Sequence, residues 1–212
     1  KARPLLLETW GFGIDLNGEG SSGGGTDAIM KQSATTALFW GAAGTGKSAA
    51  AEALGFEFGR ALKVVNFSEI ANDLRVGQKS SQGSNSLEIT FEEARAADAV
   101  LVLEGIRIES FEGEQTHDNS YQQLSFHIER FSGAVLLLVT SDEAFRPQLL
   151  PPELARLVKF TVVFDRPPPE QRAQIWRSAL PSRVPLAPDV DFAELGRRFE
   201  VCADGIASAA FR

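Results

Sequence analysis

Residues 41–48, Gly-Ala-Ala-Gly-Thr-Gly-Lys-Ser, constrain the fold of this chain more than any other segment, because they fill every fixed position of the pattern G-x-x-x-x-G-K-[ST]. The glycines of this segment permit backbone conformations that a Cβ would forbid, so successive N–H groups can converge on one anion. The segment therefore predicts a phosphate-binding loop. Its candidate ligand residues are Gly41, Ala42, Ala43, Gly44, Thr45, Gly46, Lys47 and Ser48.

The flanks of this loop support the same interpretation. Residues 36–40 form an apolar run without polar alternation, which is typical of a strand buried on both faces. An alanine-rich helical pattern follows from Lys47 to about Arg60, and its N-terminal dipole would point at the bound phosphates. We expect Lys47 to reach the β- and γ-phosphates of a nucleotide and the Ser48 hydroxyl to bind Mg²⁺. A glycine-rich surface loop that matches by chance is the alternative, and both flanks disfavour it.

Composition and charge narrow the possible function classes. With 43% hydrophobic residues, the 212-residue chain can bury a substantial core. A formal net charge of −7 disfavours binding to nucleic acid or to anionic membrane surfaces. The single cysteine, Cys202, favours an intracellular location, and no run reaches the roughly 18 apolar residues of a membrane span. We expect a soluble, cytoplasmic protein without nucleic-acid or membrane partners.

Strand and helix patterns alternate along the rest of the chain. Apolar runs predict further strands at residues 62–67, 99–103, 134–140 and 160–164, with helical patterns between and after them. This alternation calls for an α/β fold with a parallel sheet and right-handed crossovers. We assign residues 1–165 to an α/β domain, with 16–35 as a flexible Gly/Ser-rich insertion. Residues 166–212 are assigned to a helical subdomain that we expect to be truncated.

The order of these parts resembles that of the AAA+ ATPases over essentially the whole chain. The most specific matches are residues 41–54 and residues 154–181, the second of which resembles the family's arginine, final strand and first lid helix. Residues 3–16 and 190–201 resemble flanks of bacterial-type members, including those that accompany contractile injection systems. The resemblance implies a P-loop NTPase sheet in the strand order 5-1-4-3-2, a helical lid, and binding of ATP with Mg²⁺.

The carboxylate pair of the family is the first departure. In the family the third strand ends in Asp-Glu, where the aspartate supports Mg²⁺ and the glutamate polarises the attacking water; here the matching pair is Glu104 and Gly105. The resemblance implies that Glu104 holds Mg²⁺ together with Ser48. Alternatively, Glu104 itself acts as the base, or Glu109 swings in, or Glu104 is a solvated strand terminus. We expect slow hydrolysis, and we expect Gly105→Glu to raise turnover.

Other family positions are filled less completely. Ser141 matches the sensor position after the fourth strand, with a strand-end cap as the alternative. Arg156 matches the first finger arginine, which in the family acts in trans on the neighbouring subunit's γ-phosphate; a solvated loop arginine is the alternative. The pore-loop region, residues 73–77, carries no aromatic, and Ala207 stands where the lid arginine is expected. The resemblance thus implies these catalytic residues: Lys47, Glu104, Ser141 and Arg156.

Three functions remain open at this point. The first is an ATP-driven machine that assembles as a ring, expected to be a hexamer, or joins a mixed assembly, and remodels a protein client. The second is a catalytically inactive ATP-binding scaffold or regulatory subunit. A small-molecule kinase that shares the phosphate loop is the third and is less favoured. His117 and His127 have no partner at ligand spacing, so we interpret both as structural or surface residues.

Overall fold

The computed structural model describes residues 34–76, 83–106, 119–180, 183–187 and 190–210. Every described residue belongs to one compact unit. The predicted Gly/Ser-rich insertion therefore falls almost entirely outside the described residues. The division between an α/β domain and a lid at residue 165 stays a prediction.

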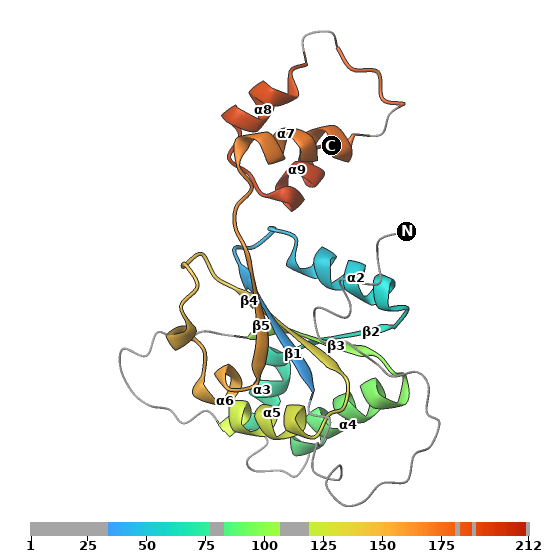
Figure 1. Cartoon of the computed structure of the whole chain (residues 1–212), viewed down its shortest axis with the longest axis vertical. Coiled ribbons are helices and arrows are strands. Elements are labelled where there is room, and N and C mark those ends of the chain that lie inside the picture. The colour runs from blue at the N-terminus through green and yellow to red at the C-terminus, as the bar shows by residue number, and fades with distance from the viewer. Residues whose placement is uncertain (1–33, 77–82, 107–118, 181–182, 188–189, 211–212) are drawn as a thin grey trace, which may run out of the picture. The chain divides into compact units, whose positions relative to one another are not determined.

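Five parallel strands form one sheet in the order β2-β3-β4-β1-β5, which is the order that the family resemblance implies (Figure 1). The strands are β1 (Thr35–Gly41), β2 (Leu62–Asn66), β3 (Val100–Ile106), β4 (Ala134–Thr140) and β5 (Val158–Phe164). Because parallel strands end at the same edge, the register sets Asn66 beside Glu104 and Gly41 beside Thr140. The carboxyl edge of the sheet therefore gathers Glu104, a candidate from sequence analysis, together with Asn66 and Thr140.

Helices connect and follow the strands. They are α2 (Lys47–Phe58), α3 (Phe67–Val76), α4 (Gly83–Ala96), α5 (Asn119–Glu129), α6 (Pro152–Ala155), α7 (Pro169–Ala179), α8 (Phe192–Arg198) and α9 (Ala203–Ala210), with a 3₁₀ turn at Pro147–Leu149. Within the described residues, none of the helices is both long and apolar enough to cross a bilayer. His127 lies on α5 and stacks on Phe91, with ring centroids 5.4 Å apart, whereas His117 lies outside the described residues.

The boundary between β2 and α3 differs from the sequence-based prediction. Phe67 was expected to end the strand, but it is the first residue of α3 and is 1% exposed. The Oδ1 atom of Asn66 accepts hydrogen bonds from the backbone N–H of Ser68, at 3.1 Å, and from the Ser68 hydroxyl, at 2.7 Å. This local turn satisfies a backbone donor at the helix start, so the chain leaves the strand one residue early.

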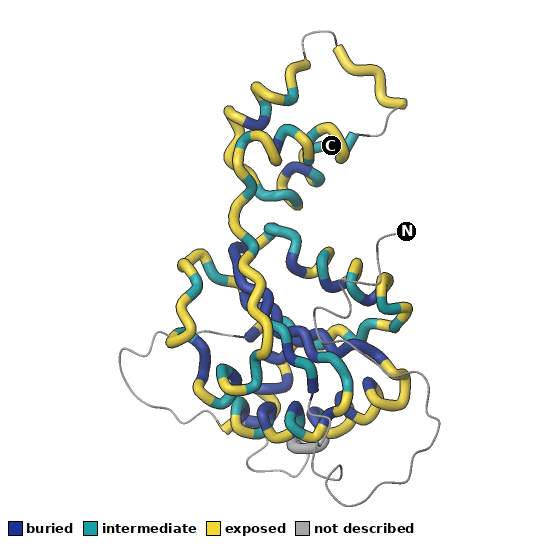
Figure 2. The backbone as a smooth tube through the Cα atoms, in the orientation of Figure 1, coloured by how far each residue is buried: buried dark blue, intermediate teal, exposed yellow. Residues whose placement is uncertain are grey.

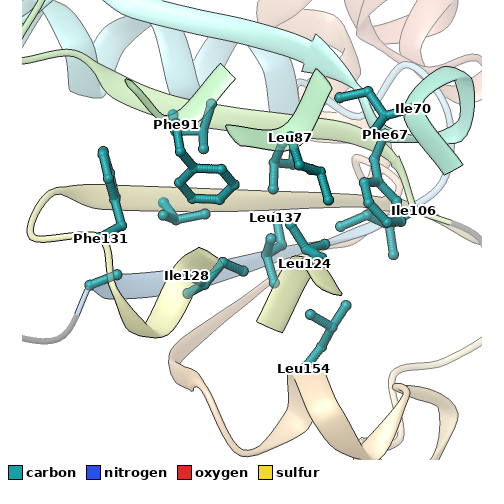
Figure 3. Packing of buried hydrophobic residues seen from close by; sticks show 14 of the residues in the cluster. Phe67, Ile70, Leu87, Phe91, Ile106, Leu124, Ile128, Phe131, Leu137 and Leu154 are labelled. Carbon is teal, nitrogen blue, oxygen red and sulfur yellow. The ribbon is translucent and has the colours of Figure 1, made fainter. Parts of the chain in front are cut away.

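Two apolar clusters cover the two faces of the sheet. The larger one joins α3, α4, α5 and α6 to the sheet, and Figure 3 shows Phe91, Leu124 and Leu137 at its centre. The smaller one lies under α2 and contains Ala51, Val100 and Val102. Figure 2 shows that residues of the central strands are mostly buried. Burial of each large side chain contributes roughly 1.5–3 kcal/mol, and the resulting rigid sheet fixes the positions of its polar edge.

Of the three C-terminal helices, which we expect to be the family's lid and refer to by that name, α8 and α9 each pack on α7. Arg172 of α7 is only 7% exposed and donates hydrogen bonds to the backbone oxygens of Gly196 and Pro167, each at 2.8 Å. Gly196 permits this approach, because a Cβ there would collide with the backbone of α7 at Pro169 and Ala173. Arg172 is therefore a structural cation that holds α8 against α7.

Candidate functional site

The loop between β1 and α2 has the conformation that the sequence pattern predicts for a phosphate cradle. Gly44 and Gly46 have φ values of +73° and +99°, which favour glycine, and Gly46 precedes the first turn of α2. The Thr45 hydroxyl donates a hydrogen bond to the backbone oxygen of Ala42 at 2.9 Å, which holds the loop closed on itself. The N-terminus of α2 thus opens at the carboxyl edge of the sheet, where its dipole favours an anion.

The Lys47 ammonium group lies inside this loop. Lys47 is 6% exposed, and its Nζ atom donates hydrogen bonds to the backbone oxygens of Gly41, at 2.9 Å, and Ala42, at 2.6 Å. Burial lowers the pKa of Lys47 below its ordinary value of 10.5, while the negative groups nearby, among them Glu104 and Asp204, oppose the shift. The side chain is therefore a buried cation that the loop backbone orients.

Ser48 and Glu104, the two predicted Mg²⁺ ligands, lie together. The Ser48 hydroxyl donates a hydrogen bond to Oε1 of Glu104 at 2.9 Å, although the residues are 56 positions apart in the sequence. A hydroxyl and a carboxylate at the mouth of a phosphate loop are oxygen donors of the kind that Mg²⁺ prefers. The pair therefore fits a magnesium ion, and its role as a metal site stays a prediction.

Gly105, which stands at the family's glutamate position, has a conformation that excludes an ordinary side chain. Its φ is +71°, and the pairing of β3 with β4 is irregular between Leu103 and Ile106. A Cβ at this position would lie 2.5 Å from the Ser68 hydroxyl and collide with Oδ1 of Asn66. A glutamate here would need both a strained backbone and displacement of that hydrogen-bonded pair. This backbone therefore disfavours the expectation that Gly105→Glu raises turnover.

A cavity of about 560 Å³ lies at this edge of the sheet, a size typical of small-molecule sites. It is lined by Ala43, Gly44, Gly46, Lys47, Ser48, Ala49, Glu104, Gly105, Leu138, Thr140, Ala203 and Asp204. Sequence reasoning did not find Thr140, Ala203 or Asp204. Thr140 had a usable signal, because it is the last residue of a predicted strand. No local pattern marks Asp204, which reaches the cavity from the lid.

Ser141 is next to the cavity, but its side chain has another partner. The described residues that line the cavity include Thr140 and not Ser141. The backbone N–H of Ser141 donates to the backbone oxygen of Gly41 at 3.0 Å, which joins the ends of β4 and β1. Its hydroxyl accepts a hydrogen bond from the backbone N–H of Glu143 at 3.1 Å. This geometry matches the strand-end cap, and the sensor role of Ser141 stays a prediction.

Arg156 lies outside the cavity of its own chain. It directly follows α6, and its Nη1 atom forms an ion pair with Oε1 of Glu129 on α5 at 2.6 Å. Its side chain is 57% exposed, so the guanidinium group is available at the surface. The structure does not bring Arg156 to Lys47 and Ser48, and a role in trans stays a prediction.

The remaining family positions are only partly described. Glu109, the alternative base, lies outside the described residues. In the pore-loop region, Leu74 is buried and Asp73 is exposed, whereas Gly77 lies outside the description. Ala207 is half-buried on α9, next to the fully buried Ile206.

The chain matches a model of a known protein family. A model of the ATPase family associated with various cellular activities (AAA) matches residues 37–168, which is more than half of the chain. The matched segment includes the phosphate loop, most of β1, the four other strands and Arg156. A search of curated proteins found no match to the chain.

Proposed function

The chain belongs to the ATPase family associated with various cellular activities, and on that premise we propose that it binds ATP with Mg²⁺ and hydrolyses ATP slowly within an oligomeric protein-remodelling or assembly machine. The observation that carries the proposal is the convergence of Lys47, Ser48 and Glu104 on one cavity at the carboxyl edge of the sheet. These residues come from two separate segments of the sequence, 47–48 and 104, and the fold joins them. Their chemistry suits a polyphosphate and a divalent cation.

Each of these side chains has a distinct role in the proposed site. Lys47 would bind the β- and γ-phosphates, because its buried ammonium group is directed into the loop that cradles them. Ser48 and Glu104 would hold Mg²⁺, which neutralises phosphate charge when bound. The backbone of residues 43–46 would surround the phosphates with N–H groups. The protein would therefore promote hydrolysis mainly by orienting the phosphates and by balancing their charge.

The proposed hydrolysis is slow because the second carboxylate of the family pair is missing. Gly105 occupies its position, and the hydrogen-bonded pair Asn66 and Ser68 occupies the adjacent space. Glu104 is already engaged with Ser48 and is therefore a poor candidate for a free base. A water molecule would attack with less activation than in a site that holds both carboxylates.

The proposed assembly is a ring, with a hexamer expected, or a mixed ring with other family members. Arg156 supports it, because an exposed arginine outside its own cavity can complete the cavity of a neighbouring subunit. Family members commonly form such rings. A heterologous contact between identical subunits gives a closed ring when the rotation from one subunit to the next is a whole-number fraction of a full turn. The substrate of the machine would be a protein client.

A catalytically inactive scaffold is the second candidate, and Gly105 is the observation that favours it. Such a protein would bind ATP and use occupancy to stabilise an assembly by mass action. Steady-state phosphate release from Mg²⁺ and ATP, measured across protein concentration, separates the two candidates. Release that rises with self-association supports the slow hydrolase. Tight ATP binding with no release at any concentration contradicts hydrolysis and favours the scaffold.

A further inference from the structure

The carboxylate of Asp204 lies directly against the phosphate loop. A Cβ built on Gly44 would fall on the carboxylate of Asp204, so this side chain fills the space beside the loop that the glycine leaves open. Asp204 also lines the same cavity as Lys47 and Ser48. The position of Gly44 thus requires glycine both for its φ of +73° and for the approach of this carboxylate.

The lid holds Asp204 in this position. The residue lies in the first turn of α9, and its Oδ1 atom accepts a hydrogen bond from the backbone N–H of Gly205 at 2.7 Å. Two residues further on, Ile206 is fully buried, and α9 packs on α7. Because the helix is anchored on its apolar side, the carboxylate is presented to the loop by a packed element.

The charges around the cavity are unbalanced. Of the described residues that line it, Lys47 carries a positive charge, and Glu104 and Asp204 carry negative charges. Two arginines of the C-terminal segment have other partners: Arg172 donates to the backbone oxygens of Gly196 and Pro167, and Arg166 pairs with Asp142 at 2.8 Å. The charged side chains that line the cavity therefore have a net negative charge. They would repel a bound polyphosphate, because like charges at short range repel each other.

We propose that Asp204 is a specificity-determining residue that weakens the binding of nucleoside triphosphates relative to diphosphates and makes the binding of both depend on a divalent cation. The inference rests on the proposed nucleotide site. The third phosphate brings one more negative charge into the cavity, so the repulsion from Asp204 is larger for ATP than for ADP. A divalent cation removes two charges from either ligand and offsets the repulsion. Asp204 of the lid would thus repel the phosphates, whereas an arginine in its place would attract them.

The test is a calorimetric titration of the full chain with ATP and with ADP, each with Mg²⁺ and with a chelator. Asp204→Asn removes the charge and keeps an oxygen that can accept from Gly205. In the presence of Mg²⁺, we expect this variant to bind ATP about tenfold more tightly than wild type and ADP at most about threefold more tightly. We also expect the affinity lost on chelation to be smaller. Asp204→Glu keeps the charge and is expected to keep the discrimination between the two nucleotides.

The matched control is Asp191→Asn in the same lid. Asp191 caps α8 by accepting a hydrogen bond from the backbone N–H of Ala193 at 2.8 Å, and it does not line the cavity. Its replacement should leave the ratio of ATP to ADP affinity unchanged. Circular dichroism checks that each variant is folded, and Asp204→Ser decides the question if Asp204→Asn does not fold.

The outcomes separate this inference from the proposed function. Binding of both nucleotides with the same affinity ratio in wild type and Asp204→Asn overturns the role of Asp204 and leaves the nucleotide site intact. Binding that appears only in the charge-removing variants supports the inference in its strongest form. Failure of the folded wild type and of every folded variant to bind either nucleotide overturns the nucleotide site itself.

Discussion

The hydroxyl of Ser48 donates a 2.9 Å hydrogen bond to Glu104, which joins the first turn of α2 to the carboxyl end of β3. The two residues belong to separate motifs, and only the parallel pairing of the strands brings them together. Hydroxyl and carboxylate oxygens in contact at a phosphate loop form a ready pair of ligands for Mg²⁺. The proposal of a nucleotide site therefore depends on this contact as much as on the loop itself.

Replacement of Glu104 by glutamine should reduce the dependence of ATP binding on Mg²⁺. The amide still accepts a hydrogen bond from Ser48, but it is neutral and a weaker ligand for a hard cation. We expect the affinity for ATP with Mg²⁺ to fall by about tenfold and the affinity in chelator to change little. The measurement is a calorimetric titration at fixed ionic strength. An unchanged Mg²⁺ dependence would remove Glu104 from the metal site.

Replacement of Gly105 by glutamate should destabilise the protein and should not raise turnover. The new side chain would require a left-handed backbone and would displace Asn66 and Ser68. We expect the free energy of unfolding to fall by roughly 2–4 kcal/mol, measured by denaturant titration.

Two alanine variants isolate the cause. Gly59 has a φ of +63° and open space around it, whereas Gly105 has a φ of +71° and close neighbours. We therefore expect Gly105→Ala to lower the free energy of unfolding more than Gly59→Ala does. The extra loss would come from the close contact of the new methyl group with Asn66 and Ser68. Equal losses in the two variants would mean that backbone strain alone explains the position.

Replacement of Arg156 by alanine should leave ATP binding intact and remove the rise of phosphate release with protein concentration. The residue lies outside its own cavity, so only a neighbouring subunit could use it. Its exposed ion pair with Glu129 contributes about 1 kcal/mol or less, so the fold should persist. Arg60→Ala, which breaks another surface ion pair, with Asp98, is the control. Concentration-dependent release that persists in Arg156→Ala would contradict a finger role.

As the pH rises, ATP binding should weaken at a lower pH than it would if Lys47 had the pKa of an exposed lysine. Burial lowers the pKa of Lys47 below 10.5, so the folded protein without nucleotide loses this proton at a pH where an exposed lysine keeps it. Only the protonated side chain attracts phosphate. We expect the dissociation constant of ATP to rise between neutral pH and pH 10.5, as measured by titration in a series of buffers. A constant affinity over that window would contradict the role of Lys47.

The lowered pKa of Lys47 also affects the stability of the protein, and the contribution of this residue should increase with pH while ATP binding weakens. Where the pH lies between the lowered pKa and 10.5, the unfolded chain binds more protons at Lys47 than the folded chain, so the free energy of unfolding contributed by this residue rises with pH. In Lys47→Met this contribution should disappear. The comparison of the two proteins by denaturant titration isolates it from the other lysines.

The sequence predicts the sheet well because its apolar runs are bounded sharply by polar residues. Ala134–Thr140 was predicted to the residue, and the strand order was implied by the family resemblance. Strand β5 begins two residues before its predicted start, because it is an edge strand with an exposed face and therefore a weaker pattern. The end of β2 was missed because the turn at Asn66 is a side-chain hydrogen bond that periodicity does not record.

The candidate site was predictable where it depends on local chemistry and not where it depends on packing. The loop residues and Glu104 follow from a motif and a strand end. Asp204 could not be found, because its place beside Gly44 results from how the lid packs. Likewise, the closed space around Gly105 is set by Asn66 and Ser68, which lie on a different strand and helix. Long-range approaches of this kind have no signature in a single sequence.

The central claim is that residues 41–48 bind the phosphates of ATP, and one calorimetric titration tests it most directly. Wild type and Lys47→Ala are titrated with ATP in Mg²⁺, with Lys63→Ala as a control for loss of a partly exposed lysine, which pairs with Glu93 at 2.7 Å. We expect binding to wild type and Lys63→Ala, and an affinity at least about 100-fold weaker for Lys47→Ala. Equal affinity for wild type and a folded Lys47→Ala would contradict the claim.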